Sequence, residues 1–166
     1  MKSYLLSTLA LRFAHGPLVD FERTHPHDWL VWEPSPWAPP TATTQKLPRL
    51  PTPLPGPAPV PMGDCLALAL DSATHAPQLT LGRSPDCDLT LSDGTLSSVH
   101  LVFMRAQQGT LWTVRDANSR NGTSLDGIKL AAGQPAVLRS GAQLVAAQLQ
   151  LTYLTPSSLF ARLKPA

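Results

Sequence analysis

The chain has 166 residues, enough for one domain with an extension, and 43% of them are hydrophobic, so a packed core can form. The formal net charge is only +2 and no stripe of basic residues occurs, which argues against a nucleic-acid-binding protein. No apolar run approaches the roughly 18 residues of a membrane-spanning helix, so we expect no membrane segment.

The first residues of the chain have the spacing of a short helix. Leu5, Leu9 and Phe13 recur every four residues, which is typical of a short helix or of a loosely packed segment. The same stretch carries Lys2 and is interrupted by Arg12, without a clear small-x-small cleavage site, so it does not predict a secretion signal. We therefore expect a cytoplasmic protein.

Residues 28–33 are typical of a short strand that carries Trp29 and Trp32, and Trp37 follows two prolines later. One interpretation is a docking or ligand-binding element. We favour the other, that these tryptophans cover an apolar patch of the protein's own fold, because exposed they would form an adhesive surface. Just before this strand, His25 and His27 flank a proline without a further group of ligands, so we interpret them as surface residues and predict neither a metal nor another cofactor.

Eleven of the 18 prolines fall in residues 34–61, and from Pro51 to Pro61 they occupy alternate positions. This pattern favours an extended polyproline II linker and excludes a helix or a central strand. We therefore divide the chain into four segments. Residues 1–33 form an N-terminal segment that packs on the main domain through tryptophans, and residues 34–61 form a proline-rich linker. Residues 62–155 form the main domain, and residues 156–166 form a C-terminal helix or tail.

From Met62 onward the chain reads as a series of short strands separated by turns, with a two-residue hairpin at Asp126 and Gly127. This predicts an all-β sandwich of about ten to eleven short strands, with a proline-rich N-terminal extension and a short C-terminal helix that begins after Thr155. We expect Cys65 and Cys87 to be small buried hydrophobes, and a disulfide is the alternative. The expected strands of this region are 65–71, 78–81, 88–91, 99–104, 111–114, 123–125, 128–130, 136–138, 143–145 and 148–154.

Three short motifs stand at the ends of these strands. They are Gly82 with Arg83, the Ser97-x-x-His100 spacing, and the Asn121-Gly122-Thr123 triplet. Turns at one end of a sandwich can converge on one ligand. An arginine fork, a serine hydroxyl and an asparagine amide together would form a donor-rich pocket for a small anion.

Together with Asp88, Leu89, Asp116, Ser119 and Gly127, these motifs resemble the forkhead-associated (FHA) domain family, whose members read phosphothreonine peptides. The resemblance covers about residues 62–155. It implies that Arg83 and Ser97 contact the phosphate, and that Asn121 bonds the main chain of the peptide. Ser98 is a further candidate peptide-binding residue, at a position where the family often has Arg or Asn, and the serine lowers the expected affinity.

The resemblance also assigns supporting roles. Arg120 would line the groove, with a solvated arginine as the alternative, and a surface salt bridge to Asp86 is the alternative for Arg83. Structural support of the site falls to Gly82, His100, Gly122 and Thr123. A Ser97–His100 catalytic dyad is disfavoured, because residues three apart in a strand point to opposite faces.

The sequence therefore predicts a non-enzymatic phosphothreonine-binding module that acts in Ser/Thr kinase signalling or phospho-dependent assembly. The partners would be a phosphothreonine-containing protein or peptide and a Ser/Thr kinase. An FHA-like scaffold that binds protein without phosphate, in a secretion or envelope assembly, is the alternative. Residues 41–52 could also act as a self-ligand if Thr41, Thr43, Thr44 or Thr52 were phosphorylated, although a plain spacer is the simpler interpretation.

Overall fold

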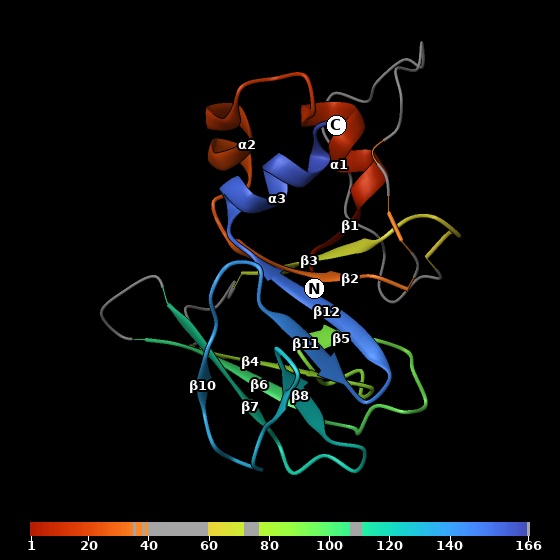
Figure 1. The fold of residues 1–166 in the computed structure, drawn as a ribbon, viewed down its shortest axis with the longest axis vertical. Coiled ribbons are helices and arrows are strands. Elements are labelled where there is room, and N and C mark those ends of the chain that lie inside the picture. Colours follow the sequence, from red (N-terminus) through yellow and green to blue (C-terminus); the bar gives the residue numbers. More distant parts are fainter. Residues whose placement is uncertain (35, 38, 40–59, 72–76, 107–110, 166) are drawn as a thin grey trace.

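A computed structural model describes the chain in several stretches, which are residues 1–34, 36–37, 39, 60–71, 77–106 and 111–165 (Figure 1). Most of the proline-rich segment, including the four threonines of the self-ligand hypothesis, lies outside the described residues. Within the described stretches, none of the helices has both the length and the apolar content that a membrane crossing requires.

Two β-sheets form the body of the protein, with twelve strands among the described residues. All strand pairs are antiparallel except β4 with β5. The seven-stranded sheet contains, in spatial order, β1 (Ser3–Leu5), β3 (Leu66–Leu70), β2 (Asp28–Trp32), β12 (Leu149–Leu154), β11 (Gln143–Ala146), β8 (Thr123–Leu125) and β9 (Ile128–Lys129). The five-stranded sheet contains β10 (Ala136–Val137), β7 (Trp112–Asp116), β6 (Leu101–Arg105), β4 (Gln78–Gly82) and β5 (Leu89–Thr90).

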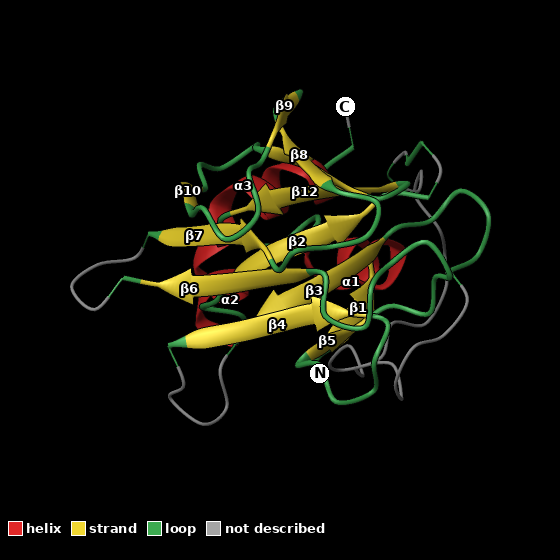
Figure 2. Cartoon of the chain, turned by 90° about the horizontal axis from the view of Figure 1, so that it is seen from below, coloured by secondary structure: helices red, strands yellow, loops and turns green. Residues whose placement is uncertain are grey.

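Three helices form a third layer on the seven-stranded sheet. They are α1 (Leu6–Phe13), α2 (Leu18–Thr24) and α3 (Pro156–Leu163), which gather above β2 and β3 in Figure 1 and lie behind the strands in Figure 2. The predicted β-sandwich with a C-terminal helix is confirmed. The sequence interpretation missed β1, because Leu5 had been assigned to the helix that in fact begins at the next residue.

The segment before the proline-rich stretch contributes directly to the main sheet. Strand β2 lies between β3 and β12, with Trp32 opposite Leu66 on one side and Leu151 on the other. The four-segment division of the chain stays a prediction, but hydrogen-bonded strands join its first and third segments into one sheet. Trp29 is fully buried and Trp32 is partly buried.

Strand β3 is buried on both faces. Leucine alternates with alanine along this strand, a pattern typical of a strand with one core-facing side, yet all five residues are buried. The leucines pack between the two sheets with Phe103, and Ala67 and Ala69 pack under the helices with Trp29. The helical layer therefore explains the difference, because it supplies a second core that the strand pattern alone does not reveal.

His25 belongs to this second core, so its interpretation as a surface residue was wrong. Its side chain is only 4% exposed, and its Nε2 atom is buried without a hydrogen-bond partner. The ring packs edge-on against Tyr4, Phe13 and Trp29, with centroids 5.1, 5.6 and 5.5 Å away. Burial in this aromatic cluster lowers the pKa of His25 to about 4. Among the described residues, no group of three or more His, Cys, Asp or Glu side chains could hold a metal ion.

Asp64 ties α1 to the chain that follows the proline-rich segment. Its buried carboxylate accepts hydrogen bonds from the backbone N–H and the hydroxyl of Ser7, at 3.1 and 2.5 Å. The residue before α1, Leu5, offers no side-chain cap, so a residue distant in sequence supplies an acceptor for the first turn.

Both cysteines are buried, and burial raises the pKa of Cys65 to about 11, so its thiol stays protonated at neutral pH.

Candidate functional site

The predicted ligand-contacting residues converge on one hollow, which we call the loop hollow. It has a volume of about 520 Å³ and its lining includes Arg83, Thr95, Ser97, Ser98, Arg120 and Asn121. The loops that form it come from three separate parts of the chain. They follow β4, precede β6 and connect β7 to β8, and the last of these lies at the end of the molecule remote from the helices (Figure 1).

Gly82 allows the first two of these loops to approach each other. A Cβ atom on this residue would lie 2.2 Å from the backbone oxygen of Ser98 and 2.9 Å from that of Ser97. The close approach lets the N–H of Arg83 donate to the Ser97 carbonyl and that of Ser84 to the Ser98 carbonyl, each at 3.0 Å. Glycine is therefore required here for contact between backbones, which fixes the base of the arginine relative to the serine loop.

His100 joins the serine loop to the asparagine loop from beneath. Its ring is fully buried, with Nδ1 accepting from the Ser97 N–H at 3.1 Å and Nε2 placed 3.0 Å from the Gly122 carbonyl oxygen. Because one partner is a donor and the other an acceptor, the neutral ring must carry its hydrogen on Nε2. Both ring nitrogens are thereby engaged with the backbone of the two loops.

The same contacts bear on the catalytic alternative. Ser97 and His100 lie in the loop before β6 and not within a strand, so the reason given from strand geometry does not apply. The Ser97 hydroxyl oxygen instead accepts from the Arg120 N–H at 2.9 Å, and the histidine bonds the serine backbone. This arrangement lacks the hydroxyl–imidazole hydrogen bond of a Ser–His dyad. The serine hydroxyl hydrogen stays available for an anion in the loop hollow.

Asp116 organises the loop that presents Arg120 and Asn121, and it was not among the predicted site residues. It is 4% exposed and accepts from the Ser119 N–H and from the hydroxyls of Ser119 and Thr123. Burial acts to raise the pKa of this carboxyl, but these hydrogen bonds outweigh burial and hold the pKa below its usual value. A carboxylate three residues before Ser119, at the end of β7, was the available sequence signal.

Two further contacts complete the asparagine loop. Gly122 has a φ of 78°, the left-handed conformation expected for an Asn-Gly turn, and its N–H donates to the Ser119 hydroxyl at 3.1 Å. The Asn121 amide donates to the Thr95 carbonyl at 2.7 Å, which leaves one amide hydrogen and the amide oxygen for a ligand. Thr95 had no sequence signal, because its contribution comes from the backbone.

The charged side chains that line the loop hollow are all positive. Arg83 and Arg120 line it, whereas no Asp or Glu does. The alternative of a salt bridge from Arg83 to Asp86 is not observed, since the ion pairs among the described residues are Lys2–Asp71, Arg23–Asp20 and Arg162–Glu33. Two unpaired guanidinium groups beside a serine hydroxyl favour an anionic ligand that accepts several hydrogen bonds.

The comparison with protein families agrees with the motifs. The family model for the FHA domain matches residues 79–146, which run from β4 to β11. No curated protein matches the chain. Strands β1, β2, β3 and β12 and all three helices lie outside the matched residues.

Several solved structures are similar to this chain. The FHA domain of the CT664 protein from Chlamydia trachomatis shares 20% identity over 53% of this chain and 83% of that chain, with a TM-score of 0.45. The MEK1 FHA domain in complex with the HOP1 pThr318 peptide shares 24% over 54% and 87%, with a TM-score of 0.45. A structure from a study of phosphothreonine-dependent FHA domain interactions shares 16% over 77% and 96%, with a TM-score of 0.48. The resemblance drawn from the sequence motifs is thus confirmed by the family match, and residues 79–146 of this chain are identified as FHA-domain sequence.

Proposed function

We propose that the protein is a non-catalytic module that binds a phosphothreonine-containing peptide in the loop hollow. The observation that carries this proposal is the convergence of Arg83, Ser97, Ser98, Arg120 and Asn121 on a hollow lined by two arginines and no carboxylate. A phosphate dianion offers acceptor oxygens to a guanidinium fork and to hydroxyl donors, and its charge matches the unpaired arginines.

In this proposal the side chains have distinct tasks. Arg83 binds phosphate oxygens, and the hydroxyls of Ser97 and Ser98 donate to them. Asn121 hydrogen-bonds the peptide main chain beside the phosphothreonine through the amide groups that Thr95 leaves free. The threonine γ-methyl would pack near Leu96, a buried residue of the same lining, and a buried methyl contributes about 1 kcal/mol.

The biological setting follows from the same ligand. A Ser/Thr kinase would create the phosphothreonine, so the module would act in kinase signalling or in phosphorylation-dependent assembly. We keep a cytoplasmic location as part of the proposal. A self-ligand from residues 41–52 remains a hypothesis that falls outside the described residues.

The test is calorimetry or fluorescence anisotropy with a phosphothreonine peptide library and its unphosphorylated counterpart. We expect micromolar binding of phosphorylated peptides only, with a preference over phosphoserine of about fivefold. Arg83→Ala should abolish measurable binding, and Arg139→Ala, an exposed arginine outside the loop hollow, should not. Equal binding with and without phosphate would instead favour the phosphate-independent scaffold.

A further inference from the structure

A second hollow adjoins the loop hollow across the asparagine loop, and we call it the hairpin hollow. Its lining includes Asp116, Gly122, Lys129 and Leu130, and it shares Arg120 and Asn121 with the loop hollow. A peptide held by Asn121 therefore lies at the border of both hollows. Nothing in the proposed role of Arg83 or Ser97 uses the hairpin hollow.

Lys129 is held beside this border by the β8–β9 hairpin. Asp126 and Gly127 form the two-residue turn, both with positive φ, and Lys129 pairs with Ser124 across the hairpin. The side chain of Lys129 runs back over Gly122, since its Cε atom lies 3.6 Å from the position of a Cβ on that glycine. Its ammonium group is therefore carried toward the loop that presents Asn121, on a short and well-defined turn.

Neither Asp116 nor Asp126, the carboxylates of these loops, forms an ion pair with Lys129. Asp116 is occupied by hydrogen bonds from Ser119 and Thr123, and Asp126 accepts from the Gln143 N–H at 2.9 Å. None of the ion pairs among the described residues involves Lys129. With Arg83 and Arg120, three unpaired cations thus face two adjoining hollows whose single carboxylate is buried and hydrogen-bonded.

Arg83 and Arg120 already match the two negative charges of one phosphate dianion, so Lys129 is an additional cation beside the buried Asp116 carboxylate. We propose that the preferred ligand is an acidic phosphothreonine peptide, with a second acidic group, from Asp, Glu or another phosphorylated residue, seated in the hairpin hollow beside Lys129. The inference rests on the proposed function, because it takes the loop hollow as the phosphate site. Lys129 would act as a specificity-determining residue, and Leu130 would contact the aliphatic part of the acidic side chain.

The experiment is a glutamate scan of a parent peptide that contains one phosphothreonine in an otherwise uncharged sequence. Glutamate is placed in turn at each of the positions on either side of the phosphothreonine, and affinity is measured by anisotropy at low and at physiological salt. For wild-type protein we expect a gain of about threefold at one position or two neighbouring positions, larger at low salt. Lys129→Gln should remove that gain, and Lys129→Glu should turn it into a loss.

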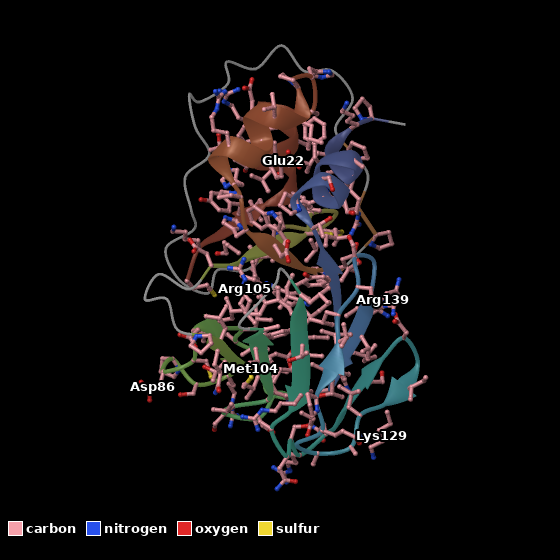
Figure 3. The ribbon with its side chains drawn as sticks, turned by 90° about the vertical axis from the view of Figure 1, so that its left-hand side faces the viewer. Glu22, Asp86, Met104, Arg105, Lys129 and Arg139 are labelled. Carbon is pink, nitrogen blue, oxygen red and sulfur yellow. The ribbon has the colours of Figure 1, made fainter. Side chains whose placement is uncertain are left out.

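The matched control is Arg139→Gln, which changes the net charge by the same amount at an exposed residue that lines neither hollow. Figure 3 labels Arg139 at a separate place from Lys129. The control should keep the position-dependent gain. A gain of equal size at every position, or one that survives Lys129→Gln, would overturn the inference while leaving the phosphate site intact. Failure of the parent peptide to bind wild-type protein would overturn the proposed function itself, so the two failures are distinguishable.

Discussion

The contact between Gly82 and the serine loop leads to a sharp prediction for Gly82→Ala. The added methyl would lie 2.2 Å from the Ser98 oxygen and 2.8 Å from the Ser98 carbonyl carbon, and both are backbone atoms that cannot rotate away. Ordinary van der Waals separation requires the two segments to move apart by about 1 Å. Overpacking of this kind costs about 1–3 kcal/mol, so the free energy of unfolding should fall by that amount while the protein still folds.

The same displacement should damage the loop hollow. It lengthens the hydrogen bonds from Arg83 and Ser84 to the serine loop and moves Ser97 away from the Arg120 N–H. We expect phosphothreonine-peptide affinity to fall at least about tenfold, which corresponds to about 1.4 kcal/mol.

Urea unfolding gives the stability, and anisotropy gives the affinity. Gly94→Ala is the stability control, because Gly94 lines the same hollow yet has no atom within 4 Å of its Cβ position. If Gly82→Ala unfolds at the same urea concentration as Gly94→Ala and binds like wild type, the reasoning from backbone contact is refuted.

Three further predictions concern pH and the helical layer. Because the pKa of His25 is lowered in the folded protein, the unfolded chain binds a proton at a higher pH than the folded protein does. The free energy of unfolding should therefore be full above about pH 6.5 and fall by up to about 3 kcal/mol as the pH drops toward about 4. His25→Phe should flatten this pH dependence in urea titrations, and an unchanged slope would contradict the role of His25. The affinity for a phosphothreonine peptide should weaken as the pH falls from about 7.5 to 5.5, because the phosphate loses its second charge near pH 6 and Arg83 favours the dianion. An affinity that calorimetry finds unchanged over this pH range would argue against charge-matched binding. Asp64→Ala removes the acceptors of the Ser7 N–H and hydroxyl, so we expect a loss of about 1–2 kcal/mol, whereas an unchanged thermal melt would show that the cap contributes little.

The loops that carry the candidate site could be predicted because their motifs have local physical causes. The Asn-Gly pair predicted a left-handed turn, and Asp126 with Gly127 predicted a two-residue hairpin, and both have the expected positive φ. The residues proposed to bind the ligand, Arg83, Ser97 and Asn121, could be predicted because arginine, serine and asparagine side chains always carry hydrogen-bond donors. Asp116 was recognised as a motif position but was given no role in the site, because it holds the loop through buried hydrogen bonds, and Thr95 carried no signal because it acts through its carbonyl oxygen.

The helical layer could not be predicted to the same extent, since its packing joins residues far apart in the sequence. The alternating pattern of β3 is compatible with one core or two, and only the position of α1 and α3 decides between them. His25 was misjudged for the same reason: a histidine beside a proline resembles a surface residue until Tyr4 and Trp29 are placed around it. Short motifs thus reveal turns and ligand donors, but they do not reveal which distant segments share a core.

Because β2 is the strand between β3 and β12, the residues that join Trp32 to Leu66 close a loop and do not tether a separate module. A protease that cuts this loop would produce two fragments that each supply strands to the same sheet, and they should remain associated until a denaturant separates them. A chain that started at Met62 would instead lack a central strand and leave β3 and β12 without their common neighbour. A division of the chain between Trp32 and Leu66 therefore splits one sheet and does not separate two domains.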